Sequence, residues 1–446
     1  MKTLKIAFRN LNRQKRRSVL LGIAVGFVFL ISTFILGMSN GMLQSMEYNI
    51  ANQVGGNIWI SAAKKDAETP SEKRVGYTIM GAEQKELFDS IIKELNIGVK
   101  TISLRTPIPG NFIFAGKTLP TTIWGIEENE ALAWDSISFK EGSRESMKKE
   151  NALLLSENIV KELNLVLHDT VLFETKNDAG QKTVEEFQLE GIAVDNNVLA
   201  SGMTVFANID YINKIYGVHD PNSFGAYFIM LKDQNRQDTI AQAIENKFRE
   251  KNLLVTDRAL AKKECQNMPI KSLLKQLGMG KWEGYKYFVA SMNDESQSLV
   301  QLKTLVSVIA LGILIVLLTL TMIGVVNTFR MIVFERRGEI GTMRACGAKA
   351  SFVRHIFRLE GLLLTCFGAL AGLGIAVFIM FILSCIPISA DSIFSVFAHN
   401  GHLIWRVSAG HFVVWFILLS ILTIIATAGP AGKASRMLPA EALQIK

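Results

Sequence analysis

Apolar residues occur in long uninterrupted blocks along this chain, and four uncharged blocks are long enough to cross a bilayer as helices. They lie at residues 19–38, 304–326, 361–384 and about 409–428. The overall hydrophobic content of 49% agrees with this pattern, because it is high for a wholly soluble protein of 446 residues. The sequence therefore predicts a multi-pass α-helical membrane protein with four transmembrane helices.

The stretch between the first two blocks has a different pattern, in which short strands alternate with amphipathic helices. Residues 57–61 and 170–174 predict strands, and residues 83–95 place apolar side chains at helical spacing. Ser156 is placed to cap a further helix. The apolar periodicity of the first block continues past its end, and residues 296–302 lead into the second block. We expect a large α+β domain held on helical stalks.

The charge distribution predicts which side of the membrane each segment occupies. Residues 1–38 carry a net charge of +7, residues 39–303 carry −5, residues 327–360 carry +4 and the tail after Gly429 carries +2. The positive excess therefore lies beside the ends of the apolar blocks. Cytoplasmic segments next to membrane helices are enriched in Lys and Arg in this way. This pattern predicts cytoplasmic termini and an extracytoplasmic α+β domain, and it makes a nucleic-acid surface an unnecessary explanation of the net charge.

Residues 2–17 predict a basic amphipathic helix in the membrane interface, joined to the first span by an elbow at Arg16-Arg17. Its apolar face consists of Leu4, Ala7, Phe8 and Leu11. The alternative is a disordered basic leader that only sets topology. A cleaved signal peptide is the less favoured reading of the first block, since the block is longer than usual and no small-residue cleavage site follows it.

The expected organisation follows from these patterns. It comprises a cytoplasmic elbow helix (1–17), the first transmembrane helix and stalk (18–56), the extracytoplasmic (periplasmic) α+β domain (57–292), a stalk and second transmembrane helix (293–326), a cytoplasmic loop (327–360), the third transmembrane helix (361–384), an extracytoplasmic loop (385–408), the fourth transmembrane helix (409–428) and a cytoplasmic tail (429–446).

Motifs for catalysis do not emerge from the sequence. Residues 110–118 look like a phosphate-binding loop, but five residues separate Gly110 from Gly116 where four are needed, so we expect a loop between strands. No cluster has the spacing of a metal site or a catalytic triad, and the four cysteines form no zinc pattern. The spans contain no Asp, Glu, Lys or Arg, which disfavours an ion-driven transporter. We expect no metal site and no enzyme activity in this chain.

The basic connector at 327–360 is then the remaining candidate for receiving energy from outside the chain. A helix is predicted from Phe329 to Cys346, with Gly347 placed to stop it and Ser351 placed to cap the next helix. That next helix continues directly into the third span. A short cytoplasmic helix joined in this way to a membrane helix would act as a lever.

Two features have open interpretations. GxxxG spacing occurs at Gly22 and Gly26 in the first span and at Gly368 and Gly372 in the third, and it is explained equally well by packing within one chain or by dimerisation. Residues 258–294 are basic and then rich in glycine and aromatic residues. They predict either a surface insertion or a binding loop with Trp282, Tyr285 and Tyr287.

Several segments carry a resemblance to a known family. The stretch ERRGEIGTMRACGAKASFVRHIFRLEG (335–361) resembles the signature of FtsX-like ABC transporter permeases of the MacB and lipoprotein-releasing (LolC/LolE) type. The tail GPAGKASRMLPAEAL (429–443) and the start FRNLNRQKRRSVLLGIAVG (8–26) are similar to the two ends of that family. The resemblance is patchy in the α+β domain, where His168 stands at a position that often holds Gly and the following turn is expected to differ.

The resemblance implies a role for the connector and a set of partners. By matching the motif, it assigns the ATPase-coupling helix to Glu335, Arg336, Glu339, Ile340, Gly341, Arg344 and Gly347. The implied partners are a separate cytoplasmic ABC ATPase dimer, which binds ATP and Mg, a second copy or a homologous permease, membrane lipids, and possible lipoprotein substrates and periplasmic acceptors. No cofactor is implied for this chain itself, and the implied location is the bacterial inner membrane.

The resemblance further implies mechanotransmission that extracts lipoproteins or similar amphipathic molecules from the outer leaflet. The expected apolar substrate contacts are Phe27, Phe34, Met38 and Met42, for which ordinary packing is the alternative. MacB-like efflux of a peptide, drug or haem is a second possibility. A third is a non-transporting regulator of an external cell-wall hydrolase.

Overall fold

The computed structural model divides the chain into a helical unit and an α+β unit. Residues 1–44, 303–387 and 402–446 form the helical unit, and residues 45–302 and 388–401 form the α+β unit. The structure describes residues 2–13, 15–65, 78–135, 137–176, 182–194, 204–265, 268–295, 297–388, 392, 394, 397–399 and 401–436. The end of the C-terminal motif (437–443), including Pro439 and Glu441, lies outside these residues.

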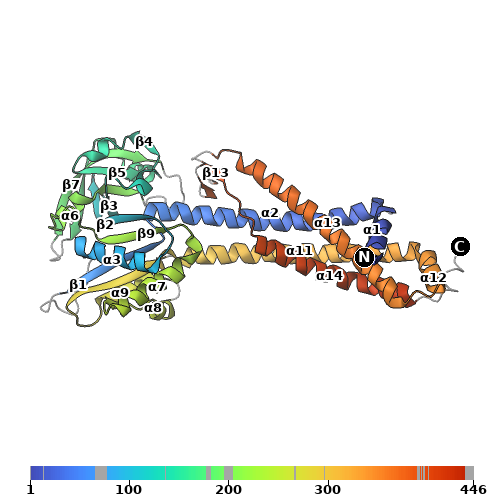
Figure 1. The fold of residues 1–446 in the computed structure, drawn as a ribbon. Coiled ribbons are helices and arrows are strands. Elements are labelled where there is room, and N and C mark those ends of the chain that lie inside the picture. Colours follow the sequence, from blue (N-terminus) through green and yellow to red (C-terminus); the bar gives the residue numbers. More distant parts are fainter. Residues whose placement is uncertain are drawn as a thin grey trace. The chain divides into compact units, whose positions relative to one another are not determined.

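In its described residues the helical unit is built from six helices (Figure 1). They are α1 (Lys2–Arg13), α2 (Lys15–Val54), α11 (Gln297–Glu335), α12 (Arg337–Ala345), α13 (Ala350–Ser384) and α14 (Ala409–Arg436). Four of them, α2, α11, α13 and α14, are long and apolar enough to cross a membrane. The prediction of a multi-pass membrane protein with four membrane helices and an α+β domain is therefore confirmed.

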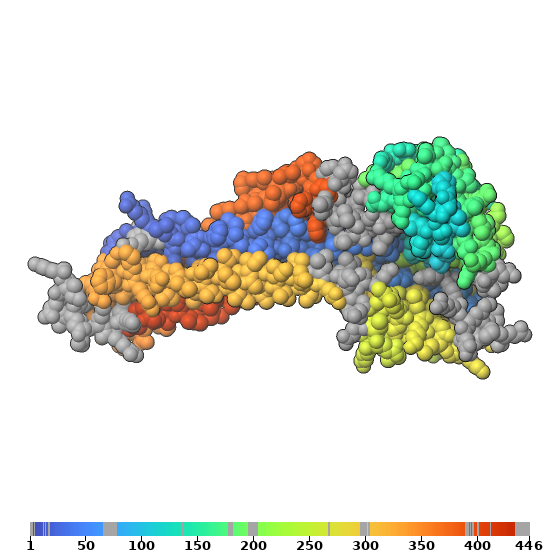
Figure 2. Space-filling view, turned by 180° about the vertical axis from the view of Figure 1, so that it is seen from behind, coloured from blue at the N-terminus to red at the C-terminus, as the bar shows by residue number. Residues whose placement is uncertain are grey.

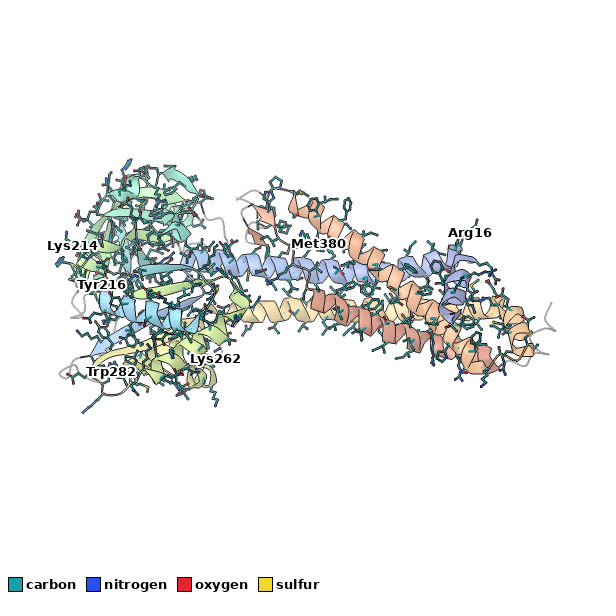
Figure 3. All side chains as sticks on the ribbon, in the orientation of Figure 1. Arg16, Lys214, Tyr216, Lys262, Trp282 and Met380 are labelled. Atoms are coloured by element: carbon teal, nitrogen blue, oxygen red, sulfur yellow. The ribbon has the colours of Figure 1, made fainter. Side chains whose placement is uncertain are left out.

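Some helix ends differ from the expected ones. The first helix ends at Arg13 and the next begins at Lys15, so the elbow precedes the expected Arg16-Arg17 pair. Figure 3 shows Arg16 within α2, beside α1. The last helix continues past residue 428 to Arg436 and contains Pro430, although Gly and Pro are poor helix formers; Ala426 and Ala431 pack in the apolar core on either side of Pro430.

The two GxxxG motifs pack against each other within one chain. A Cβ atom added to Gly372 would lie 2.2 Å from the carbonyl oxygen of Gly26, and one added to Gly368 would lie 2.8 Å from that of Gly22. The backbones of α2 and α13 therefore touch where only glycine fits. The alternative left open by the sequence is resolved for these residues in favour of packing within the chain.

One side of each membrane helix packs inward and another is left uncovered. Phe29 of α2, Phe329 of α11 and Phe357 of α13 are each about 98% buried or more in a shared apolar core with α14. The opposite face of α11 is exposed within this chain, with Val308, Val316 and Leu320 between 59% and 62% exposed. Figure 2 shows this face of α11, in light orange, along the helical unit.

The described part of the α+β unit contains an eleven-stranded sheet. Its strands are β1 (Ile58–Lys65), β2 (Val99–Phe114), β3 (Lys117–Ile126), β4 (Phe139–Gly142), β5 (Ala152–Ser156), β6 (Thr170–Lys176), β7 (Lys182–Ala193), β8 (Val205–Asn208), β9 (Ala226–Leu231), β10 (Leu254–Val255) and β11 (Gly284–Ser291). Its main helices are α3 (Ala82–Leu95), α5 (Glu157–Leu163), α6 (Ile209–Ile215), α7 (Gln237–Glu250), α8 (Arg258–Glu264) and α9 (Pro269–Gly278). Shorter helical turns are α4 (Ala131–Trp134) and α10 (Met292–Glu295), and a hairpin of β12 (Ala398–His399) and β13 (His402–Leu403) follows α13 in the chain.

The long strand β2 divides the sheet into two halves. In one half the order is β10-β11-β1-β9-β2, with α3 and α7 contributing Phe88, Ile244 and Phe248 to the core on one face. In the other half β2, β3, β8, β5, β7 and β6 pair in a closed ring, because β6 pairs with both β7 and β2. Phe112 and Phe173 fill the interior of this ring.

Several predicted local structures are present in the α+β unit. The strands expected at 57–61 and 170–174 are part of β1 and β6, and the helix expected at 83–95 is α3. Ser156 caps α5, its side chain accepting a hydrogen bond from the Ile159 amide. Residues 110–118 form a tight hairpin between β2 and β3, so most of them are strand rather than loop.

The turn at His168 keeps a glycine-type backbone although the residue is histidine. Its φ is +73°, in the left-handed region. The expected change of turn is therefore not seen. Flanking hydrogen bonds hold the turn, from the His168 amide to the Leu189 carbonyl and from the Val166 amide to Asp169 Oδ2.

A buried arginine fixes the end of α2 in the α+β unit. Arg105 on β2 is fully buried and pairs with Glu130, the Nε–Oε1 distance being 3.0 Å. It also donates to the backbone carbonyls of Asn52 and Gln53 in the last turn of α2. A cation at a helix C-terminus is favourable because the last carbonyls have no intrahelical donor.

A second buried arginine, Arg258 at the start of α8, fixes the residues just before α11. It donates to Asp294 from Nε at 2.8 Å and to Asp238 from Nη2 at 2.9 Å. Burial acts to raise the pKa of Asp238, but hydrogen bonds from Asn293 and Ser291, together with Lys262, outweigh it and hold the pKa well below its usual range. Figure 3 shows Lys262 on this side of the α+β unit.

The stretch 258–294 is an ordered part of this unit in the described residues. Lys65 lies 4.0 Å from the centre of the Trp282 ring and donates to the Gly278 carbonyl, so the glycine-rich turn is held against β1. Burial raises the pKa of Tyr287 to about 12. Trp282, labelled in Figure 3, and Tyr287 are used in packing, which agrees with the insertion reading more than with a binding loop.

Candidate functional site

The connector between α11 and α13 is the candidate functional site. The continuous helix expected from Phe329 to Cys346 is interrupted at Arg336, whose φ of −96° and ψ of 15° end α11 at Glu335 and let α12 begin at Arg337. The expectation of one helix is therefore wrong. The physical reason is that the side chain of Arg336 turns inward to form an ion pair.

Arg336 pairs with Glu360 of α13 in a buried position. The Nη1–Oε1 distance is 2.9 Å and the Nη1–Oε2 distance is 3.2 Å, with side-chain exposures of 7% and 3%. The guanidinium also lies 5.5 Å from the ring centre of Phe357. A buried pair with several hydrogen bonds is costly to break, because one charge is then left in an apolar environment.

The N-terminal helix α1 joins the same network. Asn10 donates a hydrogen bond from Nδ2 to Glu360 Oε1 at 2.8 Å, and Arg13 forms an ion pair with Glu339. Arg336 in turn donates from Nε to Glu339 Oε2 at 3.0 Å. Three helices, α1, α12 and α13, thus meet in one network, in which Arg336 joins Glu339 to Glu360 and each of these glutamates also contacts α1.

The other predicted coupling residues divide into buried and outward-facing groups. Ile340 and Gly341 are buried, so they hold α12 in place. Gly347 ends the α12 segment with a φ of +87°, as its position predicted. Arg344 donates to the Ala348 carbonyl at 3.1 Å and stiffens this turn, whereas Glu335 is exposed at the end of α11.

The start of α13 differs from the prediction. Lys349, not Ser351, occupies the N-cap position, and Ser351 lies inside the helix, where its carbonyl contacts Nδ1 of His355 at 2.9 Å. The sequence also gave no sign of the shallow cavity of about 560 Å³ beside this turn. Thr3, Ala348, Lys349, Ser351, Phe352 and His355 line it.

The predicted substrate contacts fall into two places. Met38 is 6% exposed and packs with Phe34 and Met42 against α13 and the segment after β13, including Trp405. Figure 3 shows Met380 of α13, which belongs to this cluster. Phe27 lies apart from the cluster and is 52% exposed on another face of α2.

The part of the chain that contains the connector is similar to the FtsX-like permeases. Residues 311–439 match the family model described as FtsX-like permease C-terminal, and this match includes the whole of the α11–α13 connector. The resemblance noted on the connector and tail motifs is thereby confirmed.

Proteins similar to this chain include MacB-type export proteins. The macrolide export ATP-binding/permease protein MacB 2 of Yersinia pestis bv. Antiqua (strain Antiqua) is 27% identical over 158 residues, which cover 35% of this chain and 21% of that protein. The probable syringafactin export ATP-binding/permease protein SyfD of Pseudomonas syringae pv. syringae (strain B728a) is 30% identical over 153 residues, 34% of this chain and 20% of that protein. The matched stretch thus spans about a fifth of either relative.

Solved structures similar to this chain include extracytoplasmic regions of related transporters. The periplasmic region of MacB from Actinobacillus actinomycetemcomitans is 12% identical, covering 53% of this chain and 89% of that chain with a TM-score of 0.26. The extracellular domain of YknZ, from Gram-positive bacteria, is 9% identical, covering 44% and 94% with a TM-score of 0.27. TM-scores this low do not support a conclusion about fold or activity.

Proposed function

We propose that this chain is the permease subunit of an ABC transporter and that a separate cytoplasmic ATPase drives it through α12. The observation that carries the proposal is the buried Arg336–Glu360 pair, because it joins a short outward-facing helix firmly to the start of a long apolar one. The FtsX-like family match over residues 311–439 includes this connector and supports the same reading.

In this mechanism the ATPase contacts the solvent-exposed residues of the connector. Phe352 at 36% exposure and the cavity beside it offer an apolar contact, and Glu335 offers a charge. Motion of α12 would pass to α13 through Arg336 and Glu360, and to α1 through the contact of Glu339 with Arg13 and that of Glu360 with Asn10. Since α1 is followed directly by α2, this route reaches the helix whose last turn Arg105 holds in the α+β unit.

The proposal assigns ATP and Mg²⁺ to the ATPase and no enzyme activity or cofactor to this chain. An ATPase dimer presents two docking grooves, so a second copy of this chain or a homologous permease completes the assembly. The uncovered apolar face of α11 supports such pairing within the membrane. The basic segments at residues 1–38 and 327–360 support cytoplasmic termini in a bacterial inner membrane, with the α+β unit outside.

For the substrate, we propose an amphipathic molecule taken up from the outer side, with lipoprotein release as the first candidate. Export of a smaller amphiphile is the second, and it is favoured by the names of the similar proteins, which are exporters of macrolides or syringafactin. A regulator of an external hydrolase, without transport, is the third. Phe34, Met38 and Met42 form the apolar cluster at which a substrate would enter if α2 and α13 separate.

The docking proposal is tested by recovering the tagged full chain from native membranes. An ABC ATPase should co-purify with the wild-type chain, and Phe352→Asp should lower its recovery at least about tenfold by placing a charge in the contact. Phe394→Asp is the matched control, because Phe394 is 60% exposed in the loop after α13. Absence of an ATPase from the wild-type sample, or equal recovery with Phe352→Asp, would contradict the proposal.

The substrate class is tested by photo-crosslinking from position 34 in cells. An acylated protein trapped at this position supports lipoprotein release, whereas a small amphiphile supports export. Capture of an external hydrolase, with no transported molecule and no amphiphile-stimulated ATPase activity, supports the regulatory alternative. Labelling by bulk membrane lipid alone would count against all substrate roles of the cluster.

A further inference from the structure

An apolar groove runs along the outside of the helical unit, between the N-terminal part of α2 and the middle of α13. Its volume is about 590 Å³. It extends from Lys15 to Leu30 on α2, with Phe27, Phe367 and Ile375 among its walls. These three walls are 51% to 53% exposed, so the groove is open on one side. At Leu30 it adjoins the cluster of Phe34, Met38 and Met42, since Leu30 also packs against that cluster.

The floor of the groove exists because glycine lies on both helices. The close approach of Gly26 and Gly372 brings the two backbones into contact, and Gly22 presents no side chain to the groove. At 1.5 Å per residue the span from Lys15 to Leu30 is roughly 22 Å long. The hydrocarbon layer of one leaflet is about 15 Å thick, so the groove is long enough for an acyl chain lying along it.

One end of the groove is aromatic and cationic. Phe8 of α1 contacts Phe367 of α13, with ring centres 6.3 Å apart, and Lys15 lines the groove at the same end. Arg9 and Arg16 are exposed nearby in the sequence, and residues 1–38 contain no Asp or Glu. A molecule that matches this arrangement has a negatively charged head and an extended apolar tail.

We propose that this groove binds an anionic phospholipid from the leaflet on the side of the N-terminus. One acyl chain lies between α2 and α13, and the phosphate is held beside Lys15 at the elbow between α1 and α2. The lipid would then cover the groove and brace α1 against α13. This proposal requires the chain to be in a membrane, and it does not depend on ATPase docking or on the transported substrate.

The test uses the purified full chain in nanodiscs, without any ATPase. The nanodiscs contain phosphatidylcholine with a trace of phosphatidylglycerol or phosphatidylcholine that carries a photoactivatable group at the end of one acyl chain. Labelled peptides are mapped by mass spectrometry. We expect the phosphatidylglycerol probe to label residues 18–30 and 364–375 several-fold more strongly than the phosphatidylcholine probe.

Two substitutions separate the head-group contact from the acyl-chain contact. Lys15→Gln should lower the preference for phosphatidylglycerol about five-fold, since one surface lysine contributes roughly that factor. Gly22→Leu should lower labelling by both probes at least about tenfold by filling the groove, because several methylene groups lose their contact. An added Cβ at Gly22 meets nothing within 4 Å, so the helix contact itself is retained.

Matched controls keep the result interpretable. Gly312→Leu makes the same change on α11 at another position with nothing within 4 Å, and Lys5→Gln removes an exposed charge of α1 that does not line the groove. Both should leave the labelling unchanged. Ala371→Leu on α13 replaces Gly22→Leu if that variant does not keep the wild-type melting temperature.

Three outcomes would overturn the proposal. The first is equal labelling of the groove by the two probes in the wild-type chain. The second is labelling that persists in a folded Gly22→Leu or Ala371→Leu variant. The third is crosslinking of the groove to a second copy of the chain in place of lipid. Because no ATPase is present, failure here leaves the docking proposal to be judged by its own experiment.

Discussion

Replacing Arg336 with glutamine is the most direct perturbation of the network that joins α1, α12 and α13. The substitution removes both hydrogen bonds to Glu360, at 2.9 and 3.2 Å, and the 3.0 Å bond to Glu339. Glu360 is 3% exposed, so its carboxylate would be left without a cation in an apolar setting. The hydrogen bond from Asn10 would remain but carries no charge.

The size of the effect follows from this burial. Breaking a buried ion pair on one side costs about 3–5 kcal/mol, whereas replacing both members by apolar residues of similar volume is often close to neutral. We therefore expect Arg336→Gln to destabilise the chain by roughly 3 kcal/mol and Arg336→Met with Glu360→Leu to recover most of that loss. Arg354→Gln, an exposed position four residues into α13, is the control and should change stability by less than about 0.5 kcal/mol.

The assay is thermal unfolding of the detergent-solubilised full chain, combined with ATPase recovery from membranes. A double-mutant cycle with Glu360→Gln should give a coupling energy above about 1 kcal/mol, because the residues are in direct contact. Additive losses, or a wild-type melting temperature for Arg336→Gln, would refute the assignment of Arg336 as the cation that joins Glu339 of α12 to Glu360 of α13.

Three further predictions follow from buried contacts. Gly372→Ala should destabilise the chain by about 1–3 kcal/mol, because the new Cβ would lie 2.2 Å from the Gly26 carbonyl oxygen, while Gly374→Ala meets nothing within 4 Å; equal melting temperatures would contradict the packing. Arg105→Gln should lower the stability of the fold by about 3–5 kcal/mol and speed hydrogen exchange in the last turn of α2. The control Arg144→Gln, at an exposed position, should do neither. Unchanged exchange in Arg105→Gln would be evidence against the capping of α2 by Arg105. Asp238→Asn should lose only about 0.5–1 kcal/mol at pH 7, because the Asp238 side chain is 40% exposed and solvent screens its ion pairs. Since the pKa of Asp238 is depressed, this contribution is present above about pH 4 and is lost as pH falls through the folded value. Urea titrations should therefore show the gap to wild type closing in acid, and a constant gap would be inconsistent.

Local patterns predicted the parts of the fold that depend on neighbouring residues. The helical spacing of Phe88, Ile91 and Ile92 gave α3, and Ser156 gave the start of α5, since capping acts over three residues. The apolar blocks gave all four membrane helices. The closed ring of strands was not predicted, because pairing of β2 with β6 joins residues far apart in sequence.

The candidate site was likewise predicted where local patterns decide the structure and missed where long-range contacts do. The motif at 335–347 marked the right segment, and Gly347 correctly marked the end of α12. The motif did not show that Arg336 and Ile340 face inward, because the pairing of Arg336 with Glu360 spans 24 residues. The break in the helix and the cavity beside Phe352 follow from that pairing and from the position of α1, which no local pattern specifies.

The glycine contact between α2 and α13 has a consequence for motion. Helices usually interlock through side-chain ridges that fit into grooves, and such ridges resist sliding. Where Gly26 meets Gly368 and Gly372, two bare backbones touch instead. A contact of this kind has few side-chain ridges to oppose the sliding of one helix along the other. This contact therefore lets α13 shift along its own axis against α2 without unpacking the membrane core.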